Sequence, residues 1–329
     1  MIRRMAVLIL LGAVCTQAGL AQNPGPAGAE PGGGGGYLFA HMTKEDYGRL
    51  YYSVSRDGLH WTLLNNGRRV YENYAGHPDI CRGHDGRYYM TGGSATVTLW
   101  VSPDLVRWSK HLEFNPNVYQ TPDFQPIERT HGAPKIYYDK DSAQYLITWH
   151  TSTQRKDPND FERYWSGQRT LYITSKDLQT FTPPRRLFQY DMATIDVIVR
   201  KSGGRYWAIL KDERFPSFDW PTGKAIRIAS SPSLTGPWTE PSPRTTPNYR
   251  EAPTLIPRPD GQGWYLYYEQ YPGVQYGLST SPQINGPWYD VYIMDYQVPA
   301  NARHGCMMPI SQTQYEAILR AYSDKEVQR

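Results

Sequence analysis

The sequence predicts an all-β protein, and more narrowly a five-bladed β-propeller whose ring is closed in one blade by strands from both ends of the chain. The first of two repeated patterns is an alternating strand, a turn centred on serine and then an aromatic residue. It occurs five times, at residues 50–61, 98–108, 170–181, 225–238 and 276–288. Repeats of this length without helical periodicity are typical of propeller blades. A two-sheet sandwich is the competing all-β fold, and the split first unit described next favours the propeller.

The second pattern pairs an apolar strand with an aromatic strand across a tight turn. It occurs at residues 76–90, 132–147, 194–208 and 251–266, with hairpin signals such as Asp85-Gly86 and Asp260-Gly261. One hairpin pattern followed by one serine-turn pattern gives a four-stranded unit. Only the first unit is split, because residues 37–64 supply its outer strands and residues 303–310 its inner strand. Residues 312–322 alone carry a helical spacing.

A removable leader and a flexible linker precede the predicted domain. Arg3 and Arg4 stand before an apolar run and small residues that end at Ala21, which is the order of a secretory signal peptide cleaved after Ala21. Residues 22–36 are rich in Pro and Gly and predict a flexible linker. Residues 37–329 then form a single catalytic propeller. We expect a secreted or periplasmic protein with no membrane span.

Composition excludes some partners. The chain has 35 Lys+Arg against 31 Asp+Glu, and two of the arginines lie in the leader, so nothing indicates a nucleic-acid or acidic-membrane partner. We expect a monomer. Cys81 and Cys306 either form a disulfide or remain buried thiols; the thiols are favoured, and the spacing does not indicate zinc.

The candidate site lies where the inner strands begin. In a propeller the first strand of every blade lines the axis, so polar groups at these strand starts meet in one pocket. Asp196 and Glu251 are acids in apolar runs, which makes them either paired or functional. Two carboxylates around a shared axis suit glycoside cleavage. The candidate residues at these positions are His77, Asp79, His131, Asp196, Glu251 and His304.

At these residues the chain resembles the five-bladed propellers of glycoside hydrolase family 43, over residues 37–322. The resemblance implies that Glu251 is the general acid and that Asp196 keeps it protonated. We expect His131, Arg303 and His304 to contact substrate. The resemblance also implies a place for calcium or water beside His304, with no organic cofactor. The matching motifs are Ala133-Pro134, Ile195-Asp196, Glu251-Ala252-Pro253 (with Ala for the usual Gly) and Arg303-His304-Gly305.

The sequence departs from the family pattern at the position of the general base. His77-Pro78 stands where the family has Asp-Pro, so either His77 or Asp79 serves as the base, or the site does not hydrolyse. Hydrolysis in this family implies inversion, which needs roughly 6.5–9.5 Å between acid and base.

We therefore expect an exported glycoside hydrolase that cleaves terminal arabinofuranose-like or xylose-like sugars from oligosaccharides or polysaccharides. A carbohydrate-binding propeller without activity and a polysaccharide lyase that uses His77 or His304 with a tyrosine are the alternatives. Insertions at residues 155–165 and 215–220 are expected to wall the pocket.

Overall fold

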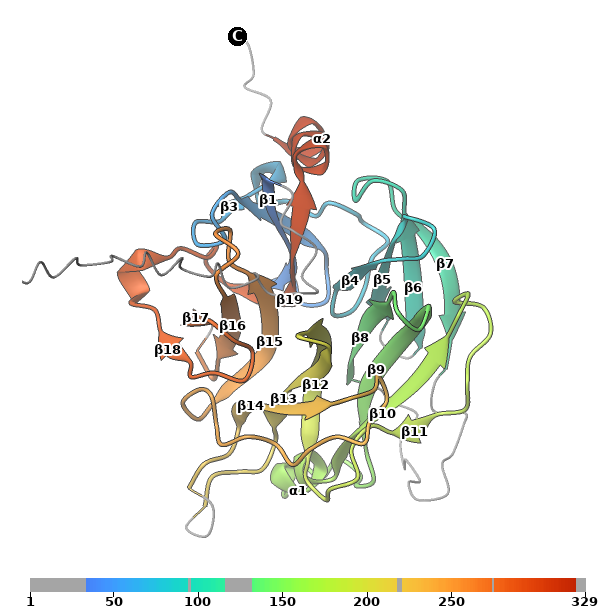
Figure 1. The fold of residues 1–329 in the computed structure, drawn as a ribbon, viewed down its shortest axis with the longest axis vertical. Helices are drawn as coiled ribbons and strands as arrows, with labels where there is room; N and C mark the ends of the chain where they lie inside the picture. Colours follow the sequence, from blue (N-terminus) through green and yellow to red (C-terminus); the bar gives the residue numbers. More distant parts are fainter. Residues whose placement is uncertain (1–33, 94–95, 116–131, 218–220, 274, 324–329) are drawn as a thin grey trace, which may run out of the picture.

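Five β-sheets stand in a ring around a central axis in the computed structural model, which describes residues 34–93, 96–115, 132–217, 221–273 and 275–323 (Figure 1). The predicted five-bladed propeller is confirmed. No helix in these ranges is both long and apolar enough to cross a membrane. The leader, residues 22–33 of the linker and the candidate His131 lie outside the described residues.

Each sheet runs outward from an inner strand on the axis. The first is β19 (Ala302–Ser311), β1 (Gly34–Thr43), β2 (Tyr51–Ser55) and β3 (Thr62–Leu63). The second is β4 (Asp79–Arg82), β5 (Tyr88–Gly92), β6 (Val97–Ser102) and β7 (Ser109–Phe114). The third is β8 (Gly132–Asp139), β9 (Gln144–Ser152), β10 (Gln168–Ser175) and β11 (Arg185–Arg186). The fourth is β12 (Thr194–Ser202), β13 (Arg205–Asp212) and β14 (Ala225–Ser231). The fifth is β15 (Arg250–Pro257), β16 (Trp264–Gln270), β17 (Gln275–Ser281) and β18 (Tyr289–Asp290).

The ring closes in the first blade as predicted. The C-terminal β19 pairs antiparallel with the N-terminal β1, with Met308 opposite Leu38 and Cys306 opposite Ala40. The predicted linker boundary needs correction, because β1 begins at Gly34 and not after residue 36. A side chain at Gly35 would place its Cβ 2.1 Å from the Ser311 carbonyl carbon, so the closing pair requires glycine there.

The fourth sheet has three strands where four were expected. Residues 239–245 still run along β14, since the backbone N–H groups of Thr239, Ser242 and Thr245 donate to its carbonyls at 2.8–2.9 Å. Pro241 and Pro243 lack an N–H group, which interrupts the ladder and leaves this edge irregular.

The serine of each repeat forms the same local turn in all five blades. Its side-chain oxygen accepts a hydrogen bond from a backbone N–H two or three residues later, at 2.8–3.2 Å. The five serines are Ser55, Ser102, Ser175, Ser231 and Ser281, and all are buried. Each copy of the sequence pattern therefore forms the same hydrogen bond from a backbone N–H to the serine side chain.

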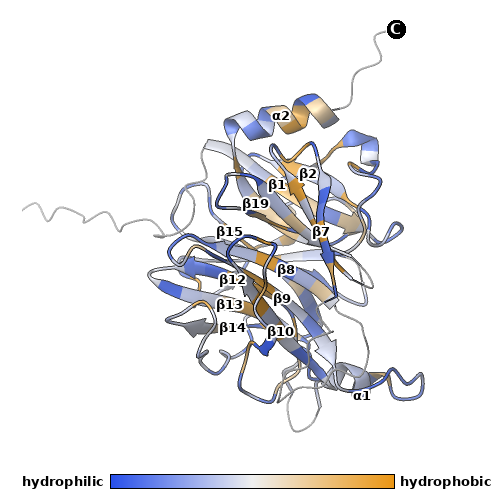
Figure 2. Ribbon diagram, turned by 90° about the vertical axis from the view of Figure 1, so that its right-hand side faces the viewer, coloured by the Kyte–Doolittle hydropathy of each residue, from blue (hydrophilic) through white to orange (hydrophobic). Residues whose placement is uncertain are grey.

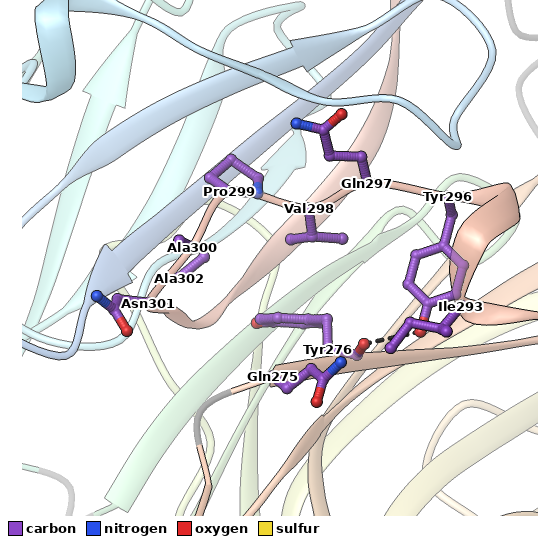
Figure 3. A pocket seen from close by; sticks show the side chains of 10 residues that line it. All are labelled: Gln275, Tyr276, Ile293, Tyr296, Gln297, Val298, Pro299, Ala300, Asn301 and Ala302. Atoms are coloured by element: carbon purple, nitrogen blue, oxygen red, sulfur yellow. Dashed lines mark hydrogen bonds between the residues drawn. The ribbon is translucent and has the colours of Figure 1, made fainter.

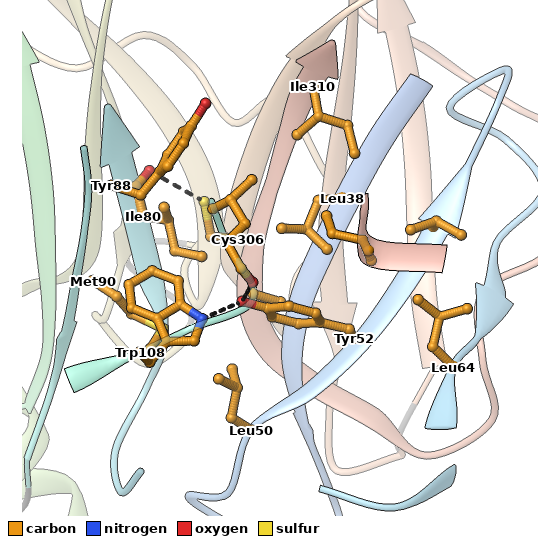
Figure 4. Packing of buried hydrophobic residues seen from close by; sticks show 14 of the residues in the cluster. Leu38, Leu50, Tyr52, Leu64, Ile80, Tyr88, Met90, Trp108, Cys306 and Ile310 are labelled. Atoms are coloured by element: carbon orange, nitrogen blue, oxygen red, sulfur yellow. Dashed lines mark hydrogen bonds between the residues drawn. The ribbon is translucent and has the colours of Figure 1, made fainter. Parts of the chain in front are cut away.

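The hydrophobic core is divided into five clusters, packed between and within neighbouring blades. The cluster between the first two blades contains Tyr52 and Trp108, and the indole N–H of Trp108 donates to the Tyr52 hydroxyl at 2.8 Å (Figure 4). Cys306 belongs to this cluster and Cys81 to the next one. Both cysteines are free and buried, which confirms the buried-thiol alternative.

The two α-helices of the described residues, α1 (Phe161–Ser166) and α2 (Gln312–Tyr322), lie at opposite ends of the propeller (Figure 2). The bounds of α2 match the predicted helical segment. Ser311 caps it, since its side chain accepts from the Gln314 N–H and the Gln314 side chain accepts from the Ser311 N–H. Tyr315 and Ile318 anchor α2 on the first core cluster. The short α1 lies in the insertion expected at residues 155–165 and was not predicted as a helix.

Candidate active site

Four of the five inner strands are bulged where they begin, near the axis. The register breaks between Gly132 and Lys135 in β8, between Ile195 and Ile198 in β12 and between Glu251 and Thr254 in β15; in β19 it breaks around His304. Each break contains a residue with positive φ, namely Ala133 (37°), Asp196 (52°), Ala252 (49°) and His304 (26°). A bulge turns a strand and redirects its side chains, so these breaks orient the polar residues that begin the strands.

Glu251 lies at the centre of the site, between two cations. Its Oε2 accepts from Lys211 Nζ at 2.8 Å, and its Oε1 accepts from the Arg303 guanidinium at 3.1 Å. The imidazole Nε2 of His304 lies 3.6 Å from Oε1. The Glu251 side chain is 12% exposed. The three partners come from β13 and β19, so the carboxylate ties three strands together.

These contacts belong to a chain of alternating charges that runs from Glu162 of α1 to Glu269 of β16. Lys224 bonds Glu162 of α1 at 3.1 Å and also bonds Glu213. Lys211 joins Glu213 to Glu251, at 2.8 Å from each. Arg303 then joins Glu251 to Glu269, with its Nε 2.5 Å from Glu269 Oε1. The order of the chain is Glu162, Lys224, Glu213, Lys211, Glu251, Arg303 and Glu269.

The ion pairs decide the charge of Glu251. Burial raises the pKa of Glu251, but Lys211 and His304 lower it by more, so the pKa lies well below its ordinary value. Glu251 is thus ionised at neutral pH in the free protein. This is the opposite of the raised pKa expected for the acid, because the expectation included the negative charge of Asp196 but not the ammonium of Lys211.

Two neighbours of Glu251 have their pKa displaced upward. Burial, and then the negative charge of Glu251, raise the pKa of Glu269. Burial lowers the pKa of His304, but Glu269, Glu251 and Asp196 outweigh it and raise that pKa. The His304 backbone N–H also donates to Glu269 Oε2 at 3.1 Å. The three groups therefore titrate as one coupled cluster.

Asp196 is joined to the Glu251 strand through the backbone. It is 2% exposed, and its Oδ2 accepts from the N–H of Ala252 at 3.1 Å. Inner strands β12 and β15 are neighbours in the ring. The structure therefore brings the two predicted carboxylates together at the start of adjacent inner strands.

His77 lies against His304 and Tyr47. The two imidazole rings have centroids 4.5 Å apart, and the Tyr47 hydroxyl lies 3.0 Å from His77 Nε2. Arg303 approaches the Tyr47 ring with its guanidinium carbon 5.5 Å from the centroid. Burial lowers the pKa of His77 well below its ordinary value, and His304, Lys135 and His150 add to this. His77 is therefore neutral near pH 7 and able to accept a proton.

Asp79 lies apart from this cluster. Its carboxylate is buried, and its Oδ2 accepts from the Ile136 N–H of the next inner strand at 2.8 Å. Within the described residues no contact joins Asp79 to Glu251. The hydrogen bond fits a role in holding β4 to β8.

The residues beside His304 do not fit a divalent cation. Glu251, Glu269 and His304 bring ligand atoms within 4.8 Å of one another, a spacing that could hold a metal ion. Arg303 already bonds both carboxylates and Lys211 bonds one of them. A dication would lie against these two cations, so the guanidinium takes the place that a calcium ion would need.

Five residues of the site were missed by the sequence reasoning, and they come from second strands and loops. Lys211 and Glu269 are the next-to-last residues of the second strands of the fourth and fifth blades, in Ala-Ile-Leu-Lys-Asp-Glu and Tyr-Leu-Tyr-Tyr-Glu. A charged residue closing an apolar strand at the same place in two blades was the available signal. The five residues are Tyr47, Lys211, Glu213, Lys224 and Glu269.

Comparison with known proteins identifies the family. A family model described as "Probable glycosyl hydrolase domain" and named as related to glycoside hydrolase family 43 matches residues 79–316. An α-L-arabinofuranosidase of Bifidobacterium longum is 31% identical over 216 residues, a match that covers 56% of this chain and 20% of that protein. The chain thus spans one fifth of the length of this curated relative.

Two solved structures share the fold. A candidate exo-β-1,3-galactanase of Bifidobacterium bifidum superimposes with a TM-score of 0.50 and 15% identity, over 68% of this chain and 70% of that one. An exo-β-1,3-galactanase of Phanerochaete chrysosporium, solved with β-1,3-galactotriose, gives a TM-score of 0.50 and 13% identity, over 78% and 54%. The family model extends over most of the propeller. The chain belongs to the glycosyl hydrolase family that is related to family 43.

Proposed function

We propose that the protein is a glycosidase that removes terminal sugars at the propeller axis, with Glu251 as general acid. The observation that carries the proposal is the juxtaposition of two acids on neighbouring inner strands: the buried Asp196 accepts the N–H of Ala252, the residue after the partly exposed Glu251. Paired carboxyl groups in unlike environments are the machinery of glycoside cleavage. Family membership supports the same reaction class.

His77 is the base in this proposal. Asp79 is held by a backbone N–H of the next blade, whereas His77 lies in the cluster and its lowered pKa leaves the imidazole neutral. Water attacks the anomeric carbon while His77 accepts its proton. Glu251 donates its proton to the leaving oxygen, the glycosidic bond breaks, and the configuration inverts.

The proposed roles require acidic conditions. Glu251 is active as an acid only when protonated, and its pKa is lowered by Lys211 and His304. His77 is active as a base only when neutral, and its pKa is lowered as well. Activity should therefore rise as the pH falls below neutrality, until His77 becomes protonated.

The first substrate to test is an α-L-arabinofuranoside, because the B. longum relative is an α-L-arabinofuranosidase. 4-Nitrophenyl α-L-arabinofuranoside, β-D-xyloside and β-D-galactoside are incubated with the protein between pH 3 and 8, and released sugar is measured. We expect Glu251→Gln to lower the rate by about 10²–10⁴-fold. Proton NMR of the first product anomer reports inversion. Undiminished activity in Glu251→Gln would refute the assignment of the acid.

Elimination from a uronic acid is the second candidate, and the Tyr47–His77 contact at 3.0 Å favours it. A tyrosine beside a neutral histidine can pass a proton from one carbon of the sugar to the leaving oxygen. Incubation with polygalacturonate separates the candidates, since elimination creates an unsaturated product that absorbs in the ultraviolet. Binding of saccharides without either product would instead indicate a carbohydrate-binding propeller.

Export is a separate proposal that rests on residues 1–21. Expression of the full chain in a bacterium, followed by N-terminal sequencing of the exported protein, should give Gln22 as the first residue. Retention of the leader in the cytoplasm would contradict it. Sedimentation of the same material tests the expected monomer.

A further inference from the structure

Glu269 is a buried carboxylate whose two oxygens bond two consecutive residues of β19. Its side chain is 0% exposed; Oε1 accepts from Arg303 Nε at 2.5 Å, and Oε2 accepts from the backbone N–H of His304 at 3.1 Å. Both of these residues reach Glu251, since Arg303 donates to its Oε1 at 3.1 Å and His304 Nε2 lies 3.6 Å from the same atom. One side chain of β16 therefore holds the two residues of β19 that contact Glu251.

The bulge of β19 explains why His304 needs this acceptor. β1 and β19 pair up to Arg303 and again from Gly305 onward, so His304 is left out of the register. Its φ of 26° belongs to the same irregularity. A residue left out of a ladder has a backbone N–H that another group must bond when it is buried, and Glu269 supplies that acceptor.

Close packing does not fix the start of β19 from the side of β17. The segment that leads into β19, residues 297–302, borders a cavity of about 210 Å³ (Figure 3). Tyr276 of β17 lines the same cavity, opposite Asn301 and Ala302. Because side chains leave this space unfilled, they cannot hold the strand start by contact from this direction. The hydrogen bonds to Glu269 therefore contribute to the position of Arg303.

Glu269 also limits how much of the Arg303 charge reaches Glu251. One guanidinium bonds both carboxylates, with Nε at Glu269 and Nη2 at Glu251. The contact to Glu269 is the shorter of the two, 2.5 Å against 3.1 Å, and Glu269 is the more deeply buried acid. Loss of the charge on Glu269 would leave the whole guanidinium to Glu251.

The other groups around Glu251 come from several elements. Its cations are Lys211 of β13 and Arg303 and His304 of β19, and its neighbouring acids are Asp196 of β12 and Glu269 of β16. The remaining titratable groups are uncharged near pH 7, because burial lowers the pKa of the histidine and raises the pKa of the tyrosines: His77, Tyr47, Tyr271 and Tyr276.

We propose that Glu269 is a positioning residue of the axial site, which holds Arg303 and His304 in place and divides the guanidinium between two carboxylates. The proposal rests on the glycosidase function above, because the effect of Glu269 on the reaction passes through Glu251. Asp196 holds the bulge of β15 in a comparable way, by accepting the N–H of Ala252.

Thermal unfolding tests whether Glu269 holds Arg303, whatever the activity of the protein. Arg303→Met leaves a buried carboxylate without its cation and should lower the melting temperature by roughly 5–10 °C. Adding Glu269→Gln removes that buried charge and should raise the melting temperature again, although Glu269→Gln alone lowers it. Glu316→Gln is the matched control, because it removes an exposed glutamate–arginine pair of α2, and it should change the melting temperature by less than about 1 °C.

The pH profile of kcat/KM tests the division of the charge. In Glu269→Gln the guanidinium bonds Glu251 alone, so the pKa of Glu251 falls. An acid that acts when protonated then loses activity at lower pH, and the alkaline limb should move down by about 0.5–1 pH unit. His304 keeps its proton in this range, since Asp196 and Glu251 also raise its pKa.

The two measurements separate the parts of the proposal. A double variant that melts below Arg303→Met would show that Glu269 does not hold the guanidinium. An alkaline limb that stays in place or moves up in Glu269→Gln, with a lower rate at every pH, would leave Glu269 a structural residue only. A wild-type protein that cleaves none of the glycosides would refute the proposed function, and the unfolding measurements would still decide whether Glu269 holds Arg303.

Discussion

At the scale of single residues, the charge of Glu251 is set by the cations that reach it. Lys211 is 2% exposed and lies 2.8 Å from both Glu251 and Glu213, so it is a buried ammonium shared by two carboxylates. Burial lowers the pKa of Lys211, but Glu213 and Glu251 more than compensate and raise it. Lys211 is therefore the main local cause of the ionised state of Glu251.

Lys211→Met should change the pH profile of the reaction. Loss of the ammonium raises the pKa of Glu251, and an acid that acts when protonated then stays active to higher pH. We expect the alkaline limb of kcat/KM to move upward by at least one pH unit. Lys224→Met is the control, because Lys224 bonds Glu213 and not Glu251. A folded Lys211→Met protein with an unchanged profile would contradict the assigned role of Glu251.

His41 should make stability depend on pH. Its Nδ1–H donates to the Met42 carbonyl at 3.0 Å, so its Nε2 accepts from the Ser53 hydroxyl at 2.9 Å and cannot bind a proton without losing that bond. Burial lowers the pKa of His41 to about 4. The unfolded chain takes up the proton from about pH 6.5 downward, so stability falls between pH 6.5 and 4, by roughly 3 kcal/mol in total.

Urea denaturation at pH 7 and at pH 4.5 measures this effect. His41→Gln removes the titrating group and should reduce the loss of unfolding free energy between the two pH values. His60→Gln is the control, because His60 is an exposed residue of the same blade. An equal loss in wild type and His41→Gln would assign the pH dependence to other groups.

Calcium should leave the protein unchanged. Because Arg303 bridges Glu251 and Glu269, the cluster is already neutralised by protein cations. We expect EDTA, or calcium at millimolar concentration, to shift the melting temperature by less than about 1 °C, since only a ligand that binds the folded state stabilises it. A rise of several degrees with calcium would show that the ion displaces the guanidinium.

At the scale of elements, two local features recur around the ring: the serine turn in all five blades and the inner-strand bulge in four of them. The serine turn sets the connection from the third strand outward, and the bulge at the inner strand aims side chains at the axis. Ala252 adopts φ of 49° in its bulge, a conformation that favours glycine. The positive φ at this position explains why glycine is usual there in family 43, whereas this chain has alanine in Glu251-Ala252-Pro253.

Ser55→Ala should destabilise the first blade. The Ser55 oxygen accepts from the Gly58 N–H at 2.9 Å in a buried turn, and alanine leaves that N–H without a partner. We expect a loss of about 1–3 kcal/mol in the free energy of unfolding, measured in urea. Ser109→Ala, at an exposed position of β7, should stay within about 0.5 kcal/mol. If the two variants had the same free energy of unfolding, the serine turn would not contribute measurably to the stability of the fold.

These devices also explain what the sequence could predict. Turn chemistry is local, so the repeats, the split first blade and the candidates at the strand starts, among them Asp196, Glu251, Arg303 and His304, could be found from the order of residues. The chain of ion pairs, by contrast, joins residues that are far apart in the sequence, so local patterns do not reveal it. Lys211 lies on the second strand of the neighbouring blade, and its contact with Glu251 depends on how the two blades are rotated, as does the resulting pKa of Glu251. Glu269 lies opposite Glu251 in the same sheet, but Arg303, which bonds both carboxylates, comes from the first blade. Tyr47 reaches His77 from a loop, and nothing in its sequence surroundings indicates that contact.

At the scale of the whole molecule, stability depends on closing the ring. The core consists of five separate clusters between and within neighbouring blades, so each blade relies on the blades beside it. The first blade contributes to two clusters, through Leu38 and Phe39 on β1 and through Cys306 and Met307 on β19. Loss of β19 therefore opens both clusters and leaves β1 without its inner partner.

Two truncations test this dependence. A chain that ends at residue 301 lacks β19 and α2, and we expect it to show no cooperative thermal transition. A chain that ends at residue 311 lacks only α2, and it should fold but melt at a lower temperature because Tyr315 and Ile318 are removed from the core. Circular dichroism and gel filtration report both. A cooperative monomer from the shorter chain would show that the ring does not need its closing strand.

The pairing of β1 with β19 also has a consequence for biosynthesis. Among the described strands β1 leaves the ribosome first and β19 last, so most of the polypeptide must be synthesised before the first blade receives its axial strand. Until then the edge of β1 is unprotected and can associate with other nascent chains. Translocation in the unfolded state, which the export proposed from residues 1–21 would involve, delays ring assembly until both ends of the polypeptide have arrived in the same compartment.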